Sequence, residues 1–231
     1  MKNIVIATIK EWNINNYFEL KKELENEYSF YLISNKDELS LEKIEKINPK
    51  YIFFPHWSWI IPENIYKNYE CILFHMTDLP YGRGGSPLQN LIINKVYNTK
   101  ISALKVTKEL DEGDIYLKED FDISKGSANE IYINASKLIF KKLIPNILRQ
   151  NPTPVSQEGV VVNFKRRTPE QSNIKMLNDV SIANLYDFIR MLDAPSYPKA
   201  YLELDNLKME LFEVIIKDGK LEGRFEVSKH E

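Results

Sequence analysis

The segment CILFHMTDLPYGRGGSPLQNLI, residues 71–92, followed by KVTKELDEGD, residues 105–114, decides the fold that we expect for this chain. Its first apolar residues are typical of a strand buried in a sheet, and the run ends at His75. The proline and glycine residues between 80 and 87 require a turn rather than a helix, because proline fixes φ and glycine permits positive φ. We therefore predict that His75 lies at the edge of a sheet and that Asp111 lies just beyond the end of the next strand.

Short apolar runs and helical segments alternate on both sides of this segment. The predicted strands are residues 4–7, 30–33, 51–54, 72–75 and 101–106, and the predicted helices are residues 17–27, 41–47, 88–96 and 128–149. Ser40 is placed to cap the second helix, and residues 10–15 form a polar loop. This alternation predicts an α/β fold with a doubly wound, Rossmann-like, mostly parallel sheet, whose ligands bind at the carboxyl ends of the strands.

The chain after residue 150 has a different pattern. Asn151-Pro-Thr-Pro-Val-Ser is rich in proline and polar residues, which is typical of a linker. Beyond it we predict strands at 160–164, 200–204, 208–216 and 221–227, a helix at 182–192 and a hairpin turn at Asp218-Gly219. The sequence thus predicts a catalytic domain over residues 1–150 and a small C-terminal α+β appendix, mainly β, over residues 151–231, which is either OB-like or built on a β-hairpin.

Composition excludes several classes of protein. The 31 Lys and Arg residues against 33 Asp and Glu residues leave a net charge of −2, so we expect neither a nucleic-acid partner nor an anionic membrane. The single cysteine, Cys71, allows no internal disulfide, which is typical of a reducing compartment. No run approaches the ~20 apolar residues of a membrane-spanning helix, and Lys10 and Glu11 cut the N-terminal apolar run too short for a signal peptide. We predict a cytoplasmic protein.

Imidazole chemistry in this chain is expected from His56 and His75, because the third histidine, His230, stands next to the C-terminus. An aspartate that faces His75 can hold the ring in one tautomer and raise its basicity, and Asp111 is the candidate. A structural histidine at a strand end is the alternative reading. Ligand spacing of the HExxH or CxxC kind is absent from the sequence, so we predict no metal site.

These segments resemble motifs of the formyltransferases that use 10-formyltetrahydrofolate. HMTDLPYGRGGSP at 75–87 resembles the family pattern H-G-S-L-L-P-x-x-R-G-x-x-P, and LDEGD at 110–114 resembles L-D-x-G-D. SWIIP at 58–62 resembles the apolar loop that lines the family's pterin pocket, and RRTPEQS at 166–172 resembles a segment of its amino-sugar members. The resemblance implies transfer of a formyl group from 10-formyltetrahydrofolate to an amine.

The resemblance also implies catalytic roles. His75 and Asp111 match two members of the family's Asn-His-Asp set, whereas Leu73 occupies the asparagine position. In the family that amide donates to the formyl oxygen as it becomes an oxyanion, and loss of such a donor costs roughly 2.7–4 kcal/mol. Our first choice for a replacement donor is His56. The alternatives are protonated His75, a tryptophan indole of the loop after the third strand, and a backbone N–H.

Binding residues follow from the same resemblance and from the expected positions of the loops. The predicted cofactor-binding residues are Trp59, Ile60, Ile61, Ser86, Lys108, Glu109, Leu110 and Asp114. The predicted substrate-binding residues are Lys10, Trp12, Asn13, Tyr81 and Arg83. Lys10 is placed to meet a phosphate and Trp12 to stack on a base or sugar, and the alternative reading is a solvated lysine beside a packed tryptophan.

Residues 74–91 also resemble the formyltransferases of the pseudaminic acid pathway, which formylate a UDP-linked 4-amino-4,6-dideoxy sugar. We therefore predict N-formylation of a nucleotide-linked amino sugar, in polysaccharide biosynthesis. Two other functions remain open: a 10-formyltetrahydrofolate hydrolase that uses the same His and Asp, and a non-catalytic folate or nucleotide-sugar binding protein, which Leu73 makes conceivable. A homodimer built on the C-terminal appendix is also left open.

Overall fold

The computed structural model describes residues 1–195 and 197–229, so His230 lies outside the described residues. The chain divides into two compact units. The first comprises Met1–Arg83, Lys100–Phe121 and Ile133–Asn163, and the second comprises Gly84–Thr99, Asp122–Tyr132 and the chain from Phe164 onward. The units therefore interleave along the sequence, whereas the predicted domains, 1–150 and 151–231, are continuous segments. That division stays a prediction.

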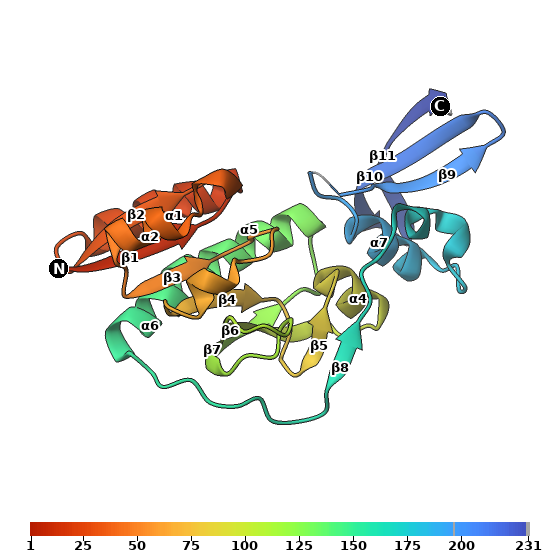
Figure 1. Ribbon diagram of the computed structural model, residues 1–231. Helices are drawn as coiled ribbons and strands as arrows, with labels where there is room; N and C mark the ends of the chain where they lie inside the picture. Colours follow the sequence, from red (N-terminus) through yellow and green to blue (C-terminus); the bar gives the residue numbers. More distant parts are fainter. Residues whose placement is uncertain (196, 230–231) are drawn as a thin grey trace. The chain divides into compact units, whose positions relative to one another are not determined.

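The first unit is built on a sheet of six strands in the order β2-β1-β3-β4-β6-β7 (Figure 1). Its strands are β1 (Lys2–Ala7), β2 (Tyr28–Ile33), β3 (Tyr51–Phe54), β4 (Cys71–His75), β6 (Asn98–Lys105) and β7 (Ile115–Asp122). Strands β1 to β4 pair in parallel, and β6 pairs antiparallel with β4. The predicted α/β fold with a mostly parallel sheet is confirmed.

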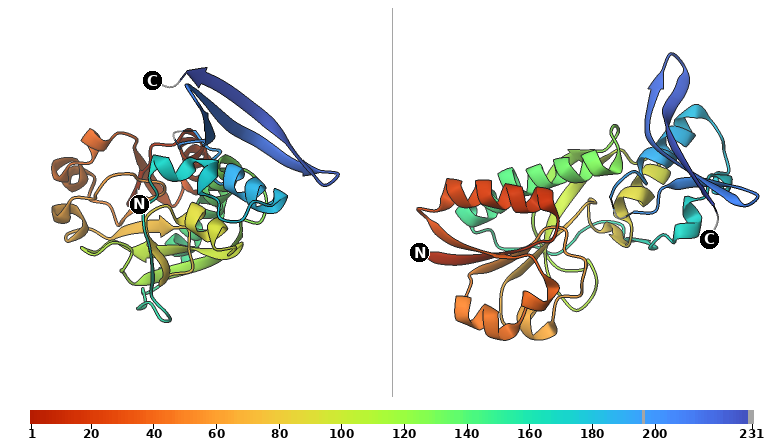
Figure 2. Two further views of the ribbon diagram at one scale, coloured as in Figure 1. Left: turned by 90° about the vertical axis from the view of Figure 1, so that its right-hand side faces the viewer. Right: turned by 90° about the horizontal axis from the view of Figure 1, so that it is seen from above.

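Helices cover both faces of this sheet. One face carries α1 (Glu11–Leu24) and the helical run that ends at Gln150, and the other carries α2 (Leu41–Ile47) and α3 (Glu63–Tyr66) (Figure 2). The helical run consists of α5 (Ala128–Leu138), a π-helical segment (Ile139–Leu143) and α6 (Ile144–Gln150), as predicted for 128–149. Because both faces are covered, β1 is fully buried from Ile4 to Ala7.

The hydrophobic core explains why local patterns in the sequence were sufficient to predict strands and helices of the first unit. Val5 and Ala7 of β1 pack in one cluster with Ile44 of α2 and Ile65 of α3. Helix α2 begins where it was predicted to begin, since Ser40 Oγ accepts a hydrogen bond from the Lys43 N–H at 3.2 Å. Alternating side chains along β1 therefore serve two cores, one on each face of the sheet.

Two local predictions, the polar loop at 10–15 and the helix start at residue 17, are wrong for the same reason. The polar loop at 10–15 is helical, because α1 begins at Glu11 rather than near Tyr17. Asn13, a weak helix former, is held in the first turn by hydrogen bonds from its Nδ2 to Thr8 Oγ1 at 2.8 Å and to the Pro55 carbonyl at 3.2 Å. Pro55 lies 42 residues away in the sequence, so local propensity could not indicate this contact.

The segment after Asn151 is not a free linker, and the strand that it joins was missed. Val155 exchanges two backbone hydrogen bonds with Ile115 at the start of β7, at 2.7 and 2.9 Å. The charged residues Lys118, Glu119 and Asp120 in β7 conceal the alternation that indicates a strand. The proline-rich segment is therefore docked on the first unit.

The second unit contains a helical and a β part. Its main elements are α4 (Pro87–Ile93), α7 (Ile182–Arg190) and an open antiparallel sheet of β9 (Ala200–Leu204), β10 (Leu207–Lys217) and β11 (Lys220–Lys229). The predicted turn at Asp218-Gly219 joins β10 to β11, and both of its residues have positive φ. The sheet has the hairpin form of the two predicted alternatives, not a barrel.

The remaining elements are short. β5 (Tyr81–Gly84) pairs with β8 (Val162–Phe164) in a two-stranded sheet, and β8 is shorter than the strand predicted at 160–164. Three 3-10 turns lie at Lys36–Glu38, Pro169–Ser172 and Ile174–Met176. Within the described parts of the chain, none of the helices has the length and apolar character that crossing a bilayer demands.

Candidate active site

His75 stands at the last position of β4, and both nitrogens of its ring have protein neighbours. Nε2 lies 2.8 Å from the Gly82 carbonyl, which only accepts, so Nε2 carries a proton and donates it. Nδ1 lies 3.5 Å from Asp111 Oδ2. The two side chains are 8% and 3% exposed, so the pair is almost fully buried. Both ring nitrogens therefore face hydrogen-bond acceptors.

The backbone of the turn that carries Asp111 is constrained by its contacts with Lys105. β6 runs antiparallel to β4 and ends with Lys105 opposite Ile72, so the following chain has to return toward His75. Lys105 N–H donates to the Asp114 carbonyl at 2.8 Å, and a Cβ on Gly113 would lie 1.8 Å from the Lys105 carbonyl oxygen. Glycine is therefore required at position 113. Asp111 itself has a left-handed backbone with φ of 57°.

Hydrogen bonds of two hydroxyl groups, those of Ser102 and Thr77, hold the loop after β4. Ser102, which is opposite His75 in the sheet, donates from Oγ to the Thr77 carbonyl at 2.7 Å and accepts from Leu79 N–H at 3.4 Å. Thr77 Oγ1 donates to the Gly82 carbonyl at 3.4 Å. The acceptor of the His75 proton is thus held in place by the neighbouring strand.

Gln157 ties this loop to the turn, and the sequence reading missed it. Its Oε1 accepts from Arg83 Nε at 3.1 Å and Nη2 at 2.9 Å, and its Nε2 donates to the carbonyls of Asp111 and Gly113, both at 2.8 Å. Arg83 Nη1 also lies 3.1 Å from Glu112 Oε1. Neither motif spacing nor local pattern marks a glutamine in a proline-rich segment, so only the folded chain could reveal it.

Leu73 occupies the position of the family's catalytic asparagine, and His56 is the predicted replacement for the amide of that asparagine. Leu73 lies on the same face of β4 as His75 and packs against Leu79 and Leu104. His56 follows β3, whose last paired residue is aligned with Leu73 in the neighbouring strand, so both histidines lie at the same end of the sheet. Burial, with Lys10 as a second cause, lowers the pKa of His56 to about 4. His56 is therefore neutral near pH 7, where it donates as N–H and not as a cation.

The loop after β3 presents aromatic and apolar side chains. The rings of Trp57 and Trp59 meet edge to face at 5.0 Å, and Trp59 is 38% exposed. Ile60 is 95% exposed, whereas Ile61 is buried in the core with α2 and α3. In the other predicted cofactor segment, Lys108 and Glu109 are exposed in the turn and Leu110 is 69% exposed. The indole N–H groups of Trp12 and Trp57 are buried and have no hydrogen-bond partner among the described residues.

The predicted substrate residues differ in how far they are accessible. Lys10 Nζ lies 5.7 Å from the centre of the Trp12 ring, which also meets His56 edge to face at 6.3 Å. Asn13 is fully buried, so its side chain serves as a tie between loops. Tyr81 is partly buried at the start of β5. The guanidinium of Arg83 contacts Gln157 and Glu112 within the protein.

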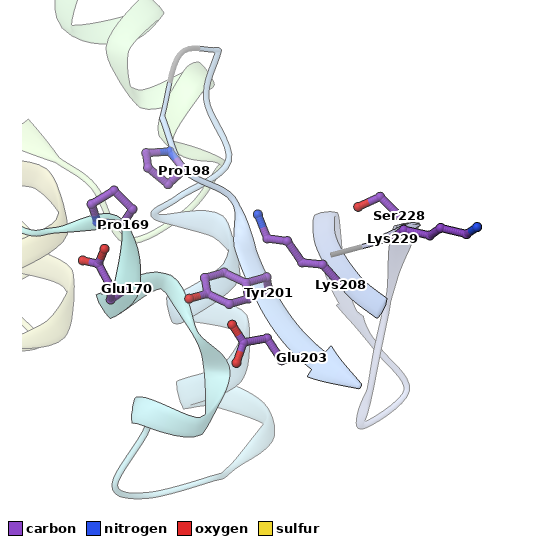
Figure 3. Close-up of a pocket in the computed structure, with 8 residues that line it drawn as sticks. All are labelled: Pro169, Glu170, Pro198, Tyr201, Glu203, Lys208, Ser228 and Lys229. Atoms are coloured by element: carbon purple, nitrogen blue, oxygen red, sulfur yellow. The ribbon is translucent and has the colours of Figure 1, made fainter. Parts of the chain in front are cut away.

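Ser86 and one cavity belong to the second unit. Ser86 precedes α4, and its Oγ accepts from Arg167 N–H at 3.1 Å. A cavity of about 430 Å³ lies elsewhere in this unit (Figure 3). It is lined by Pro169, Glu170, Pro198, Tyr201, Glu203, Lys208, Ser228 and Lys229. Among the residues that the structure describes, no group of three or more His, Cys, Asp or Glu side chains is arranged to hold a metal ion.

The sheet and the buried His75–Asp111 pair define a Rossmann-like α/β protein with an imidazole–carboxylate site at the carboxyl end of an internal strand. Residues 169–228 match the family model described as methionyl-tRNA formyltransferase, C-terminal domain. A solved structure named methionyl-tRNA formyltransferase, from Clostridium thermocellum, is 49% identical over 99% of this chain and 100% of that chain, with a TM-score of 0.95. The chain therefore belongs to the formyltransferase family.

More distant relatives show how much of the family's length this chain covers and how far the fold is shared. A curated methionyl-tRNA formyltransferase from Rickettsia bellii is 28% identical over 189 residues, which is 79% of this chain and 60% of that protein. The chain thus spans about 60% of the length of that curated relative. A sugar N-formyltransferase from Shewanella sp. FDAARGOS_354 shares the fold, with a TM-score of 0.69 at 15% identity over 97% of this chain and 96% of that one. The family is established, and the sugar-type assignment stays a proposal.

Proposed function

We propose that this chain transfers the formyl group of 10-formyltetrahydrofolate to a primary amine, with His75 and Asp111 at the reaction centre. The observation that carries the proposal is the 3.5 Å contact between His75 Nδ1 and Asp111 Oδ2 in a buried pair. A histidine oriented by a carboxylate suits a reaction in which one amine loses a proton and another nitrogen gains one.

The chemistry requires a proton acceptor next to the attacking amine. The amine nitrogen bonds to the formyl carbon, the bond from that carbon to the folate nitrogen breaks, and the released nitrogen takes up a proton. The His75–Asp111 pair accepts the proton that the amine loses and returns a proton to the released nitrogen, and the Asp111 carboxylate stabilises the imidazolium in between. Neutral His56 is our proposed donor to the formyl oxygen, in the place that Leu73 leaves without an amide.

The residues present fit the ring systems of a folate cofactor. Ile60 and Leu110 are exposed apolar side chains on the two loops that the family resemblance assigns to pterin binding, and Trp59 adds a partly exposed ring. Leu110 is next to Asp111 in the chain. 10-Formyltetrahydrofolate supplies the formyl group in this scheme, and the chain supplies its orientation and the proton transfers.

For the acceptor we favour a small molecule, a nucleotide-linked 4-amino-4,6-dideoxy sugar as the sequence predicts. Residues 169–228 contain seven Lys or Arg residues against eleven Asp or Glu residues, which leaves a charge of −4. A surface that binds tRNA relies on Lys and Arg to neutralise phosphates. An acidic C-terminal segment supports an acceptor that is not a nucleic acid.

The second candidate is the amino group of methionyl-tRNA. Its support is the printed name of the Clostridium thermocellum relative and of the curated relatives, together with the family model matched by residues 169–228. The two candidates share the donor and the reaction centre, so they differ only in how the acceptor is bound.

One assay separates these functions. The protein is mixed with 10-formyltetrahydrofolate and, in parallel, with no acceptor, with a panel of nucleotide-linked 4-amino sugars or with charged initiator methionyl-tRNA, and tetrahydrofolate release and acceptor mass are followed. Formylated sugar supports the favoured acceptor, and formylated methionyl-tRNA alone supports the second. Release without any acceptor indicates a hydrolase, and binding without release indicates a non-catalytic protein; either result overturns formyl transfer.

A further inference from the structure

We propose that Gln157 is a positioning residue for His75 and Asp111, which acts with Arg83 as a clamp between the loop after β4 and the turn before β7. The Arg83–Gln157 clamp consists of these two side chains and the hydrogen bonds between them. The inference deepens the proposed function and depends on it for its catalytic meaning, but the geometry of the clamp is independent of the reaction.

The carboxamide of Gln157 is used to its full capacity. Oε1 accepts two hydrogen bonds from the Arg83 guanidinium, and Nε2 donates two, to the carbonyls of Asp111 and Gly113. A guanidinium only donates and a carbonyl only accepts, so the orientation of the amide is determined by its neighbours. No other side chain of this size offers two acceptor sites on one side and two donors on the other.

The clamp joins the same two segments that the imidazole joins. The ring of His75 donates to the carbonyl of Gly82, which adjoins Arg83, and faces the carboxylate of Asp111, whose carbonyl is bound by Gln157. The loop and the turn are thus connected by His75, by the clamp and by the ion pair between Arg83 and Glu112.

The backbone of Asp111 is where the clamp has its largest effect. A left-handed conformation with φ of 57° is unfavourable for a residue with a Cβ, although aspartate tolerates it better than most. The hydrogen bonds from Gln157 hold the carbonyls at 111 and 113 that belong to this turn. The ion pair between Arg83 and Glu112 adds a contact to the residue between them. We infer that the clamp keeps the Asp111 carboxylate aimed at Nδ1.

The test compares two variants with a matched control. Gln157→Ala removes the clamp, and Gln157→Glu keeps an acceptor for Arg83 but turns a carboxylate oxygen toward two carbonyls. Ser156→Glu adds the same charge at the neighbouring exposed position without touching the clamp. A misplacement of about 1 Å in a catalytic group costs about 10²-fold in rate. We expect kcat to fall by about that factor in both Gln157 variants, with KM for donor and acceptor nearly unchanged, and the control to retain wild-type values.

A second readout does not require activity. The ring ¹⁵N shifts of His75 report the tautomer, and the chain has only three histidines to assign. We expect the wild type and Ser156→Glu to show the same His75 ring shifts and both Gln157 variants to show changed ones. Unchanged His75 shifts in folded Gln157 variants would overturn the proposal, whether or not kcat falls. If the wild type forms no formylated product, the proposed function fails, and the shifts still decide the clamp.

The partner side chain provides the remaining check. Arg83→Ala, Gln157→Ala and the double variant form a cycle in which residues that act as one unit give non-additive losses. We expect the double variant to have about the same kcat as the worse single variant. Multiplicative losses would overturn the clamp. If Gln157→Ala does not fold, the same cycle is run with Arg83→Lys and Gln157→Glu and judged by the same criterion.

Discussion

The properties of single residues in the first unit follow from what surrounds each side chain. His75 has a carbonyl at one ring nitrogen and a carboxylate at the other, so both nitrogens face hydrogen-bond acceptors and the orientation of the ring is set by the protein. Gly113 faces a carbonyl oxygen that excludes any Cβ. His56 is held neutral by burial and by Lys10. Two predictions belong to this scale.

Replacement of His56 should change the pH dependence of stability. The pKa of His56 is lowered from 6.5 to about 4, so the unfolded chain binds this proton before the native chain does. The stability contributed by neutral His56 is complete above about pH 6.5 and is lost as the pH falls toward 4, by up to about 3 kcal/mol.

His56→Asn is the suitable variant, because asparagine accepts the positive φ of 53° at this position. Urea unfolding of wild type and variant near pH 7.5 and pH 4.5 measures the effect. We expect the wild type to lose more free energy of unfolding than the variant over this interval. An identical loss in both proteins would show that His56 does not carry the effect.

Gly113→Ala should damage the turn far more than an alanine elsewhere. The added Cβ would lie 1.8 Å from the Lys105 carbonyl oxygen, so backbone has to move, and we expect a loss of about 3 kcal/mol or more in the free energy of unfolding. Gly219→Ala is the control, since its Cβ meets nothing within 4 Å and only the left-handed φ of 72° costs about 1–2 kcal/mol. Equal losses in thermal and urea unfolding would contradict this account.

At the scale of elements, β4 and its neighbours present the site, whereas α7 is anchored in the second unit by a buried ionic group. Asp187 of α7 accepts from Arg190 Nε at 2.8 Å, from Lys95 Nζ at 2.9 Å and from the Tyr97 hydroxyl at 2.5 Å. Arg190 is 1% exposed and donates from Nη1 to the carbonyls of Ile123 and Gly126, both at 3.0 Å. This network connects the helix to a segment more than 60 residues away in sequence.

Asp187→Ala should therefore destabilise the protein strongly. The substitution leaves the buried Arg190 cation without its carboxylate, and breaking a buried pair in this way costs about 3–5 kcal/mol. Glu42→Ala is the control, because its pair with Lys46 is exposed and is worth about 0.3–0.5 kcal/mol. Urea denaturation measures both. A loss below about 1 kcal/mol for Asp187→Ala would mean that the network does not hold α7.

At the scale of the whole molecule, charge is the property that bears on the acceptor. The chain has a net charge of −2, and residues 169–228 are more acidic than the rest. The two compact units are each assembled from three stretches of chain, so neither is a continuous sequence segment. Residues 169–228 therefore offer no net positive charge to a polyanion.

Activity should accordingly depend only weakly on salt. With a nucleotide-linked sugar as acceptor, we expect kcat/KM to change by less than about tenfold between 50 and 200 mM KCl, since few phosphates are contacted. A protein that makes six to ten phosphate contacts loses about 10³–10⁵ in affinity over this range. The same titration with methionyl-tRNA is the comparison. A steep loss on tRNA, with no activity on any sugar, would contradict the favoured acceptor.

The sequence by itself determined the elements whose signals are local. The apolar run of β1, the helical spacing of 128–149, the cap at Ser40 and the turn at Asp218-Gly219 each depend on neighbours a few residues away, so pattern and propensity were sufficient. Placing His75 at the end of a buried strand needed only the apolar run and the turn residues that follow it.

Only the tertiary structure decided which distant groups meet. The first turn of α1 is held by a hydrogen bond from Asn13 to Pro55, and the site is held by Gln157, which lies 46 residues from Asp111 and 74 from Arg83. Contacts of such separation leave no periodicity or spacing in the sequence, because each partner satisfies its local rules equally well without the other. His75 and Asp111 were foreseeable, whereas the Gly82 carbonyl and Gln157, which hold them in place, are revealed only by the fold.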